Sequence, residues 1–213
     1  MKVTIFGATG FSGQAILSEA IKQGHEVTVL VRDASKVKNR HDNLRIIVGN
    51  VLDTQAVADA LQHQDAVIQC LGVGGKGDGK PTTFISDATR VIIDEMQRQN
   101  VKRLIALSNV GAGDSETFQP WIFNKIILPY FMNWLRVIID DKNRMEPIIT
   151  NSHLDWTIVR CPNIVDKPAK ETCNTTLDGK GLKLFITLPD LAKFMVDQLK
   201  QTAFFKQAPS VSN

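Results

Sequence analysis

Cysteine is scarce in this sequence, and the net charge is small. The 213 residues include three cysteines, Cys70, Cys161 and Cys173, and 25 basic against 22 acidic residues. An odd number of distant cysteines disfavours a disulfide framework or a thiolate zinc site, so we expect reduced thiols. The net charge of +3 is too small and too scattered to indicate electrostatic binding of nucleic acid.

Long apolar runs are also missing. Five residues interrupt the most apolar segment, WIFNKIILPYFMNWLRVII: Asn124, Lys125, Pro129, Asn133 and Arg136. A membrane-spanning helix needs about 18 or more consecutive apolar residues, so we expect no membrane span. The apolar run at the N-terminus is broken at Gly7 and is too short for the hydrophobic region of a secretory signal. The sequence therefore favours a protein of the reducing cytoplasm.

The rest of the composition is that of an ordinary globular protein. Hydrophobic residues make up 43% and charged residues 22% of the chain. At about 150 residues per domain, this length favours one domain over residues 1–213. We expect no metal site, because the histidines stand apart from other ligand-type residues. They are His25, His41, His63 and His153.

Short β-branched runs alternate with segments of helical period, which is typical of strand-helix-strand units around a parallel sheet. The runs predict strands at 3–6, 26–32, 44–48, 66–71, 103–107 and 157–160. Helices are expected at 13–23, 54–62, 82–99, about 135–152 and 189–201. We predict an α/β fold with a Rossmann-type doubly wound parallel sheet in the strand order 3-2-1-4-5-6. An irregular, cap-like region at about 162–190 is expected on the substrate side.

The strongest motif is a three-glycine turn between the first strand and the first helix. It consists of Gly7, Ala8, Thr9, Gly10, Phe11, Ser12 and Gly13. In such a turn the first glycine permits the tight bend, the second lets the backbone approach a pyrophosphate, and the third lets the helix pack on the strand. The free N–H groups of the helix N-terminus then face the phosphate charge. The motif therefore predicts binding of a dinucleotide.

The residue after the second strand indicates which dinucleotide. An NAD-specific protein usually has an acidic residue there for the ribose 2′-hydroxyl, whereas this chain has Arg32. A guanidinium can bind a 2′-phosphate, and Ser35 and Lys36 are close enough in sequence to assist, which favours NADP (as NADPH) over NAD. Two alternatives stay open: Asp33 could turn inward to the ribose, or Arg32 could be a solvated surface charge.

A second glycine-rich segment, at 74–80, has the spacing of a nucleoside-triphosphate loop. It reads GGKGDGK and follows a predicted strand. The next residue, Pro81, offers neither the hydroxyl that such a loop uses for Mg²⁺ nor a backbone donor. We therefore expect a mobile loop beside the cofactor instead of a triphosphate site.

Several motifs together resemble one family. They are VTIFGATGFSG, EVTVLVRDASKV, VGNVLD, DAVIQCLG, KRLIALSNVGAG, DDKNRMEPIITNSHLDWTIVRCPNI and TTLDGKGLKLFITLPDLAKFM. On these motifs, which cover nearly the whole chain, it resembles the atypical short-chain dehydrogenase/reductases of the NAD(P)H-binding, NmrA-like type, and within them the flavin and biliverdin reductases. The resemblance implies an NADPH-dependent oxidoreductase that transfers hydride directly from the nicotinamide to a flat conjugated small molecule.

The resemblance also implies cofactor contacts. The three residues named above for the 2′-phosphate fall where the family binds that group. Asn50 and Val51 fall where it holds the adenine, and Leu71 and Gly72 fall beside the ribose and pyrophosphate. Asn50 departs from the family, whose members commonly have aspartate there, although an amide can still meet an adenine edge.

The proton donor of the better-known relatives is missing. They use a Tyr-x-x-x-Lys pair, whereas the single tyrosine, Tyr130, is followed four residues later by Trp134. This also disfavours a sugar-nucleotide epimerase, which would need the pair and a larger C-terminal domain. Ser108 and Asn109, at the end of the fifth strand, are expected to face the nicotinamide, because ligands bind at the carboxyl ends of such strands.

Two more catalytic candidates come from the resemblance. Lys142 and Asn163 align with positions that are histidines in biliverdin reductases. Lys142 could donate a proton if a cavity lowers its pKa, but an ordinary surface lysine is the expected state, and solvent is the other proton source. The alternative function is a non-catalytic NADP-binding redox sensor that acts on a protein partner, as is implied for NmrA-like proteins.

Aromatic side chains make up only 7% of the chain, yet they gather at 118–134. This segment could form the wall of an aromatic substrate pocket, a partner or dimer surface, or core, and we favour wall or core. Attachment to a membrane surface has little support, because only Lys125 and Arg136 supply positive charge. We expect a small-molecule substrate and either a monomer or a homodimer.

Overall fold

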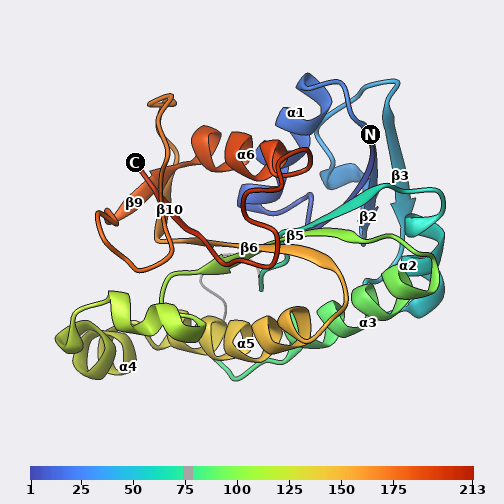
Figure 1. Ribbon diagram of the computed structural model, residues 1–213. Helices are drawn as coiled ribbons and strands as arrows, with labels where there is room; N and C mark the ends of the chain where they lie inside the picture. The colour runs from blue at the N-terminus through green and yellow to red at the C-terminus, as the bar shows by residue number, and fades with distance from the viewer. Residues whose placement is uncertain (74–78) are drawn as a thin grey trace.

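The computed structural model describes residues 1–73 and 79–213, with the backbone alone at 123, 124 and 129. Most of the second glycine-rich segment, at 74–78, lies outside the described residues, so its place beside the cofactor stays a prediction. The described chain forms a central sheet between two layers of helices (Figure 1).

Eight strands form the central sheet in the order β3-β2-β1-β4-β5-β6-β10-β8. The first six along the chain are β1 (Lys2–Phe6), β2 (Glu26–Val31), β3 (Leu44–Val48), β4 (Ala66–Gln69), β5 (Arg103–Asn109) and β6 (Asp155–Cys161). They pair in parallel, which confirms the predicted strand order and the Rossmann-type class. Strands buried on both faces require nearly continuous apolar runs, which is why the sequence indicated them clearly.

Helices cover both faces of this sheet. The long ones are α1 (Phe11–Lys22), α2 (Thr54–Leu61), α3 (Phe84–Arg98), α5 (Asn133–Thr150) and α6 (Leu188–Asp197). Helices α1 and α6 pack together on one face, whereas α2, α3 and α5 lie on the other (Figure 1). All five of the expected helices are present, so the alternation of strand and helix is a sound guide to this part of the chain.

Helix α3 shows what holds these layers together. Ile85, Ala88, Ile92 and Met96 are fully buried at helical spacing, and they pack with apolar strand residues such as Leu104. Burial of one large apolar side chain contributes about 1.5–3 kcal/mol. The amphipathic stripe therefore fixes α3 against the sheet.

The C-terminal part has more regular structure than predicted. The expected irregular region contains three short strands, β7 (Asn163–Val165), β8 (Asn174–Thr176) and β9 (Phe185–Thr187). Strands β7 and β9 pair in parallel as a separate small sheet. Strand β8 pairs antiparallel with β10 (Ser210–Ser212), which extends the main sheet beyond β6. Strands of three residues carry no periodic signal, and this is why the sequence pattern missed them.

The connection between β5 and α5 extends from the body of the fold, at the lower left of Figure 1. It contains the short helical turns η2 (Gly113–Phe118), η3 (Phe123–Ile127) and α4 (Leu128–Phe131). The prediction that this aromatic segment is core is wrong for its most exposed members. Trp121, Tyr130 and Phe131 are 67%, 79% and 77% exposed, because the connection leaves the layer that packs on the sheet.

Candidate functional site

The glycine turn is held in a shape that only glycine permits at its two ends. Gly7 has a φ of +90°, and a Cβ there would lie 2.6 Å from the carbonyl oxygen of Cys70. A Cβ at Gly13 would lie 2.0 Å from the carbonyl oxygen of Gly7. Any larger residue would therefore force the backbone of the turn to move. The first glycine makes the bend and the third lets α1 approach β1, as the motif predicts.

The N-terminus of α1 opens directly from this turn. Gly10 is the N-cap residue, its N–H donates to the Gly7 carbonyl oxygen at 3.0 Å, and no described side chain caps the helix. The first helical residues, Phe11, Ser12 and Gly13, include no acid. Their backbone N–H groups and the positive end of the helix dipole thus form a site suited to a phosphate.

The other predicted cofactor residues follow the ends of neighbouring parallel strands. Arg32 comes directly after β2, Asn50 and Val51 come after β3, and Leu71 and Gly72 come after β4. Because parallel strands point the same way, these positions lie along one edge of the sheet together with the glycine turn. The fold therefore brings the sequence-predicted cofactor residues to a common edge.

The turn after β2 bears on one alternative from the sequence, in which Asp33 turns inward to the ribose. The Asp33 carboxylate accepts hydrogen bonds from the Ser35 backbone N–H at 2.9 Å and from the Ser35 hydroxyl at 2.6 Å. These bonds lower the pKa of Asp33 and hold its carboxylate within the short turn η1 (Ala34–Lys36). Arg32 and Lys36 are exposed. Both cations are thus open to a ligand, while Oδ1 of Asp33 is used within the turn.

The Asn50 side chain stabilises a turn through its oxygen and leaves its amide N–H₂ group available to a ligand. Its Oδ1 accepts from the Leu52 backbone N–H at 3.0 Å, and its backbone carbonyl accepts from Asp53 at 2.9 Å. Within the described chain the Asn50 amide N–H₂ group has no hydrogen-bond partner, whereas Val51 beside it is buried. An aspartate could make the same turn, but only the amide adds a donor at this point.

Lys142 lies inside the protein, and the expectation of a surface lysine is wrong. Its Nζ donates to the carbonyl oxygens of Leu107 at 2.7 Å and Leu71 at 3.3 Å, so it links the chain at the ends of β5 and β4. Burial lowers the pKa of Lys142 to about 8. Lys142 lies on the side of α5 that faces the sheet. Because a lysine is normally predicted to be exposed, the sequence gave no signal that this one is buried.

Two of the cysteines are also buried at this edge. Cys70 Sγ donates to the Phe6 carbonyl oxygen at 3.2 Å, and Cys161 Sγ donates to the Ser108 carbonyl oxygen at 3.4 Å. Burial raises the pKa of each thiol to about 12. All three cysteines of the chain are free, and Cys70 and Cys161 are buried.

A buried ion pair, which the sequence reasoning missed, lies beneath Ser108. The Ser108 hydroxyl donates to Glu146 Oε1 at 2.7 Å, and the same carboxylate accepts from Arg160 Nε at 3.1 Å and Nη2 at 2.6 Å. Arg160 Nη1 also pairs with Asp114 at 2.5 Å. The network ties the ends of β5 and β6 to α5 and to the turn at 113–118. Glu146 and Arg160 belong to the motif RMEPIITNSHLDWTIVR, which also holds Arg144 and Asp155, so the sequence offered no signal that singled out this pair.

The remaining catalytic candidates lie at the same strand ends. Asn109 is partly buried, and its backbone partner across the β5–β6 pair is Cys161. Asn163 follows two residues after Cys161 and is exposed at the start of β7. The structure thus places both asparagines at adjacent strand ends.

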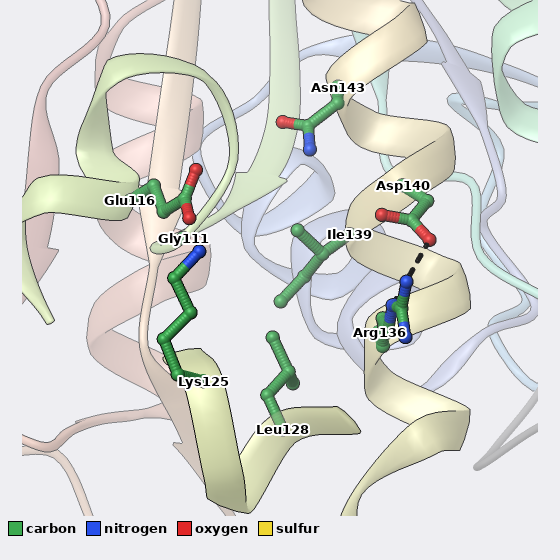
Figure 2. A pocket seen from close by; sticks show the side chains of 8 residues that line it. All are labelled: Gly111, Glu116, Lys125, Leu128, Arg136, Ile139, Asp140 and Asn143. Atoms are coloured by element: carbon green, nitrogen blue, oxygen red, sulfur yellow. Dashed lines mark ion pairs between the residues drawn. The ribbon is translucent and has the colours of Figure 1, made fainter. Parts of the chain in front are cut away.

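A cavity of about 270 Å³ opens next to this group, between α5 and the β5–α5 connection (Figure 2). Figure 2 shows two charged side chains on each side, with Leu128 and Ile139 between them. Arg136 Nε lies 3.9 Å from Asp140 Oδ2. The lining residues are Gly111, Glu116, Lys125, Leu128, Arg136, Ile139, Asp140 and Asn143. Its small volume suits a single ring system or part of a larger substrate.

The described residues offer neither a cluster of metal ligands nor a membrane-spanning helix. At 1–73 and 79–213 no group of three or more histidine, cysteine or acidic residues could hold a metal ion. Of the helices formed by these same residues, none has the length and apolar character needed to cross a membrane.

Comparison with known proteins assigns the family. A model of NAD(P)H-binding domains matches residues 7–202. The uncharacterised protein YwnB of Bacillus subtilis is 26% identical over 208 residues, which cover 94% of this chain and 92% of YwnB.

Solved structures share the fold. ChuY, an anaerobilin reductase from Escherichia coli O157:H7, superposes with a TM-score of 0.79 at 20% identity over 100% of this chain and 97% of its own. A short-chain dehydrogenase/reductase from Veillonella parvula in complex with NADP has a TM-score of 0.76 at 17% identity over 100% and 94%. The resemblance to NAD(P)H-binding, NmrA-like proteins is confirmed, and the chain belongs to the NAD(P)H-binding family of Rossmann-fold proteins.

Proposed function

We propose that the protein is an NADPH-dependent oxidoreductase of the flavin and biliverdin reductase kind, which transfers hydride directly to a flat conjugated small molecule. The observation that carries this proposal is the turn at the end of β1, where two glycines leave no room for a Cβ and the N-terminus of α1 has no side-chain cap. Two similar structures support the proposal: the Veillonella parvula protein is in complex with NADP, and ChuY is described as a reductase.

The residues at this edge fit a phosphorylated dinucleotide. Backbone N–H groups of 10–13 would hold the pyrophosphate, and Arg32 and Lys36 would hold the 2′-phosphate. Residues 50–51 would hold the adenine and 71–72 the ribose. Bound NADPH supplies the hydride, so the task of the chain is to bind, to orient and to exclude water.

Ser108 fits an orienting role better than a proton-donating one. Its hydroxyl donates to Glu146 Oε1 at 2.7 Å, and the side chain is fully buried beneath the strand ends. We propose that Ser108 holds the Glu146–Arg160 pair, and with it the ends of β5 and β6, in the orientation that the cofactor and substrate require. Asn109 and Asn163, at the neighbouring strand ends, would contact the substrate side.

Lys142 contributes chiefly positive charge. Its Nζ contacts two carbonyl oxygens and, at 3.7 Å, the sulfur of Met145, so its donors already have acceptors. Delivery of a proton would require that one of these bonds break. We therefore propose that the buried ammonium stabilises negative charge that develops on the substrate, with solvent as the main proton source.

The same contacts favour one other candidate function. Ser108 and Lys142 are both committed to internal hydrogen bonds, and the Tyr-x-x-x-Lys pair is missing from the sequence. A protein that binds NADP without turnover, and signals the redox state to a partner, would need no open proton donor. A redox sensor of the NmrA-like type is therefore the second candidate.

One assay separates the two functions. The purified chain is mixed with NADPH and, in turn, with FMN, a quinone and biliverdin, and the loss of nicotinamide absorbance is followed. Turnover above the background of the acceptor alone supports the reductase. Tight NADPH binding with no turnover of any acceptor would contradict it and favour the sensor.

A further inference from the structure

The turn after β3 presents two hydrogen-bond donors that are adjacent along the chain. Asn50 Oδ1 accepts from the Leu52 backbone N–H at 3.0 Å, so the planar amide directs its Nδ2 away from the turn. The backbone N–H of Val51 has no acceptor in the part of the chain that the structure describes, and neither does Asn50 Nδ2. A ligand at this point therefore meets donors.

The order of the strands places these donors at the base end of a bound dinucleotide. In a Rossmann-type sheet the pyrophosphate lies at the turn after the first strand, and the ribose 2′ position lies at the end of the second. The next strand outward is β3, because this edge of the sheet has the order β3-β2-β1. The base of a dinucleotide that lies along this edge thus reaches residues 50 and 51, a step that rests on the proposed function.

The acceptors near these donors already hold backbone N–H groups. The Asn50 carbonyl oxygen accepts from the Asp53 N–H at 2.9 Å. The Asp53 carboxylate caps α2, where its Oδ1 accepts from the Gln55 N–H at 2.9 Å. On the side of β2, Asp33 Oδ1 accepts from the N–H and the hydroxyl of Ser35. Both neighbouring carboxylates thus stabilise their own turns, which leaves the amide of Asn50 as the outward group.

A donor distinguishes purine bases by the atom that it meets at position 6. Adenine has an amino donor there beside the N7 acceptor, whereas a 6-oxopurine has acceptors at both O6 and N7. We propose that the base subsite of this chain takes a 6-oxopurine as readily as adenine, so that nicotinamide hypoxanthine dinucleotide phosphate binds at least as tightly as NADPH. The Asn50 amide donates to O6 but opposes the adenine amino group. An aspartate would accept from that amino group and so restore the preference for adenine.

The test is calorimetric titration of the whole chain with NADPH and with nicotinamide hypoxanthine dinucleotide phosphate. For the unmodified chain we expect equal affinities, within about threefold, or tighter binding of the hypoxanthine form. Asn50→Asp makes the same turn and should shift the ratio of the two dissociation constants toward NADPH by at least about fivefold, the lower end of what a base-edge contact contributes. Both ligands carry the same phosphates, so the added negative charge acts equally on both and cancels in the ratio.

Asn43→Asp is the matched control, because it makes the same change at an exposed residue just before β3, at the opposite end of the strand. It should leave the ratio unchanged, and thermal unfolding checks that both variants are folded. A preference of the unmodified chain for NADPH beyond about threefold, a smaller shift in Asn50→Asp, or the same shift in Asn43→Asp would overturn the proposal. In each of these cases both nucleotides still bind, so the proposed function stands. Failure of both nucleotides to bind would contradict the proposed function itself, and this inference with it.

Discussion

The glycine turn at 7–13 and the connection between β5 and α5 both link a strand to a helix. The conformation of the first is set by backbone contacts, and the second is marked by exposed apolar side chains. At the glycine turn the limits come from the backbone, since a Cβ on Gly7 or Gly13 would overlap carbonyl groups. In the β5–α5 connection large apolar side chains, among them Trp121, Tyr130 and Phe131, project into solvent from short helical turns. A close approach of two backbone segments requires glycine, so the sequence reveals it. Whether an apolar segment is buried or exposed depends on which part of the fold packs against it, and the sequence pattern does not reveal that.

The largest expected effect is at the glycine turn. Gly13→Ala places a Cβ 2.0 Å from the Gly7 carbonyl oxygen, so the turn must open. We expect unfolding in urea to show a loss of about 2–4 kcal/mol, with much weaker NADPH binding. Gly72→Ala is the control, because a Cβ there meets no atom within 4 Å, and its stability should change by less than about 0.5 kcal/mol. Equal stability of the two variants would contradict the backbone argument.

The next effect concerns the ion pair that anchors the base of the β5–α5 connection. Glu146→Gln leaves the buried guanidinium of Arg160 with only the exposed partner Asp114. Loss of one partner from such a buried pair should cost about 3 kcal/mol in the free energy of unfolding. Asp114→Asn, at a carboxylate that is 79% exposed, should cost less than about 1 kcal/mol. A reversed order would show that the anchor lies at the surface.

The next prediction concerns the preference for NADPH over NADH, where the expected change in binding free energy is similar to or smaller than the loss of stability at the ion pair. Arg32→Ala should weaken NADPH binding by about 1.5–3 kcal/mol and leave NADH binding nearly unchanged, because only NADPH carries the 2′-phosphate. Titration calorimetry with both nucleotides measures the difference. Arg45→Ala removes another exposed arginine, near the start of β3, and should change neither affinity. The same loss for NADPH and NADH would remove the assigned role of Arg32.

Lys142→Met tests the charge at the strand ends. Methionine fills a similar volume but removes the ammonium, so turnover should fall by about tenfold while NADPH affinity changes little. Stability gives a second readout. The pKa of Lys142 is about 8 in the fold against an ordinary value of 10.5, so the unfolded chain binds more protons between these values and stability should rise with pH there. The variant should lose both effects, and an unchanged rate would leave Lys142 a structural role only.

The smallest effect is expected at His25, just before β2. The side chain is 1% exposed, and burial lowers its pKa below the ordinary 6.5. Stability from the neutral ring is therefore fully present above pH 6.5 and is lost as the pH falls below it. Urea midpoints measured from pH 8 to pH 5 should fall less steeply for His25→Leu than for the unmodified chain. Parallel curves would contradict this assignment.

The sequence predicted the strands because most of them, β1, β2, β4, β5 and β6, are almost wholly buried and have nearly continuous apolar runs, and it predicted their order from the Rossmann-type class. The glycine turn was equally accessible, since its spacing reports the backbone conformation directly. Strands β7 to β10 were missed because three-residue strands depend on pairing with distant partners. The exposure of Phe131 was missed for the same reason: apolar periodicity shows that one face needs cover but does not identify the cover.

The candidate site divides in the same way. Arg32 and the glycines could be placed from local spacing, whereas Glu146 and Arg160, 14 residues apart, meet only because α5 packs on the sheet. The burial of Lys142 follows from that packing as well. Sequence reasoning therefore found the residues that gather at one edge of the sheet, and it left the polar network beneath them undetected.

The most direct test of the central claim is calorimetric titration of the unmodified chain with NADPH and NADH under the same conditions. The account predicts a saturable heat for NADPH, with an affinity at least about tenfold higher than for NADH, because the 2′-phosphate meets Arg32 and Lys36. No heat with either nucleotide at millimolar concentration, or tighter binding of NADH, would contradict it.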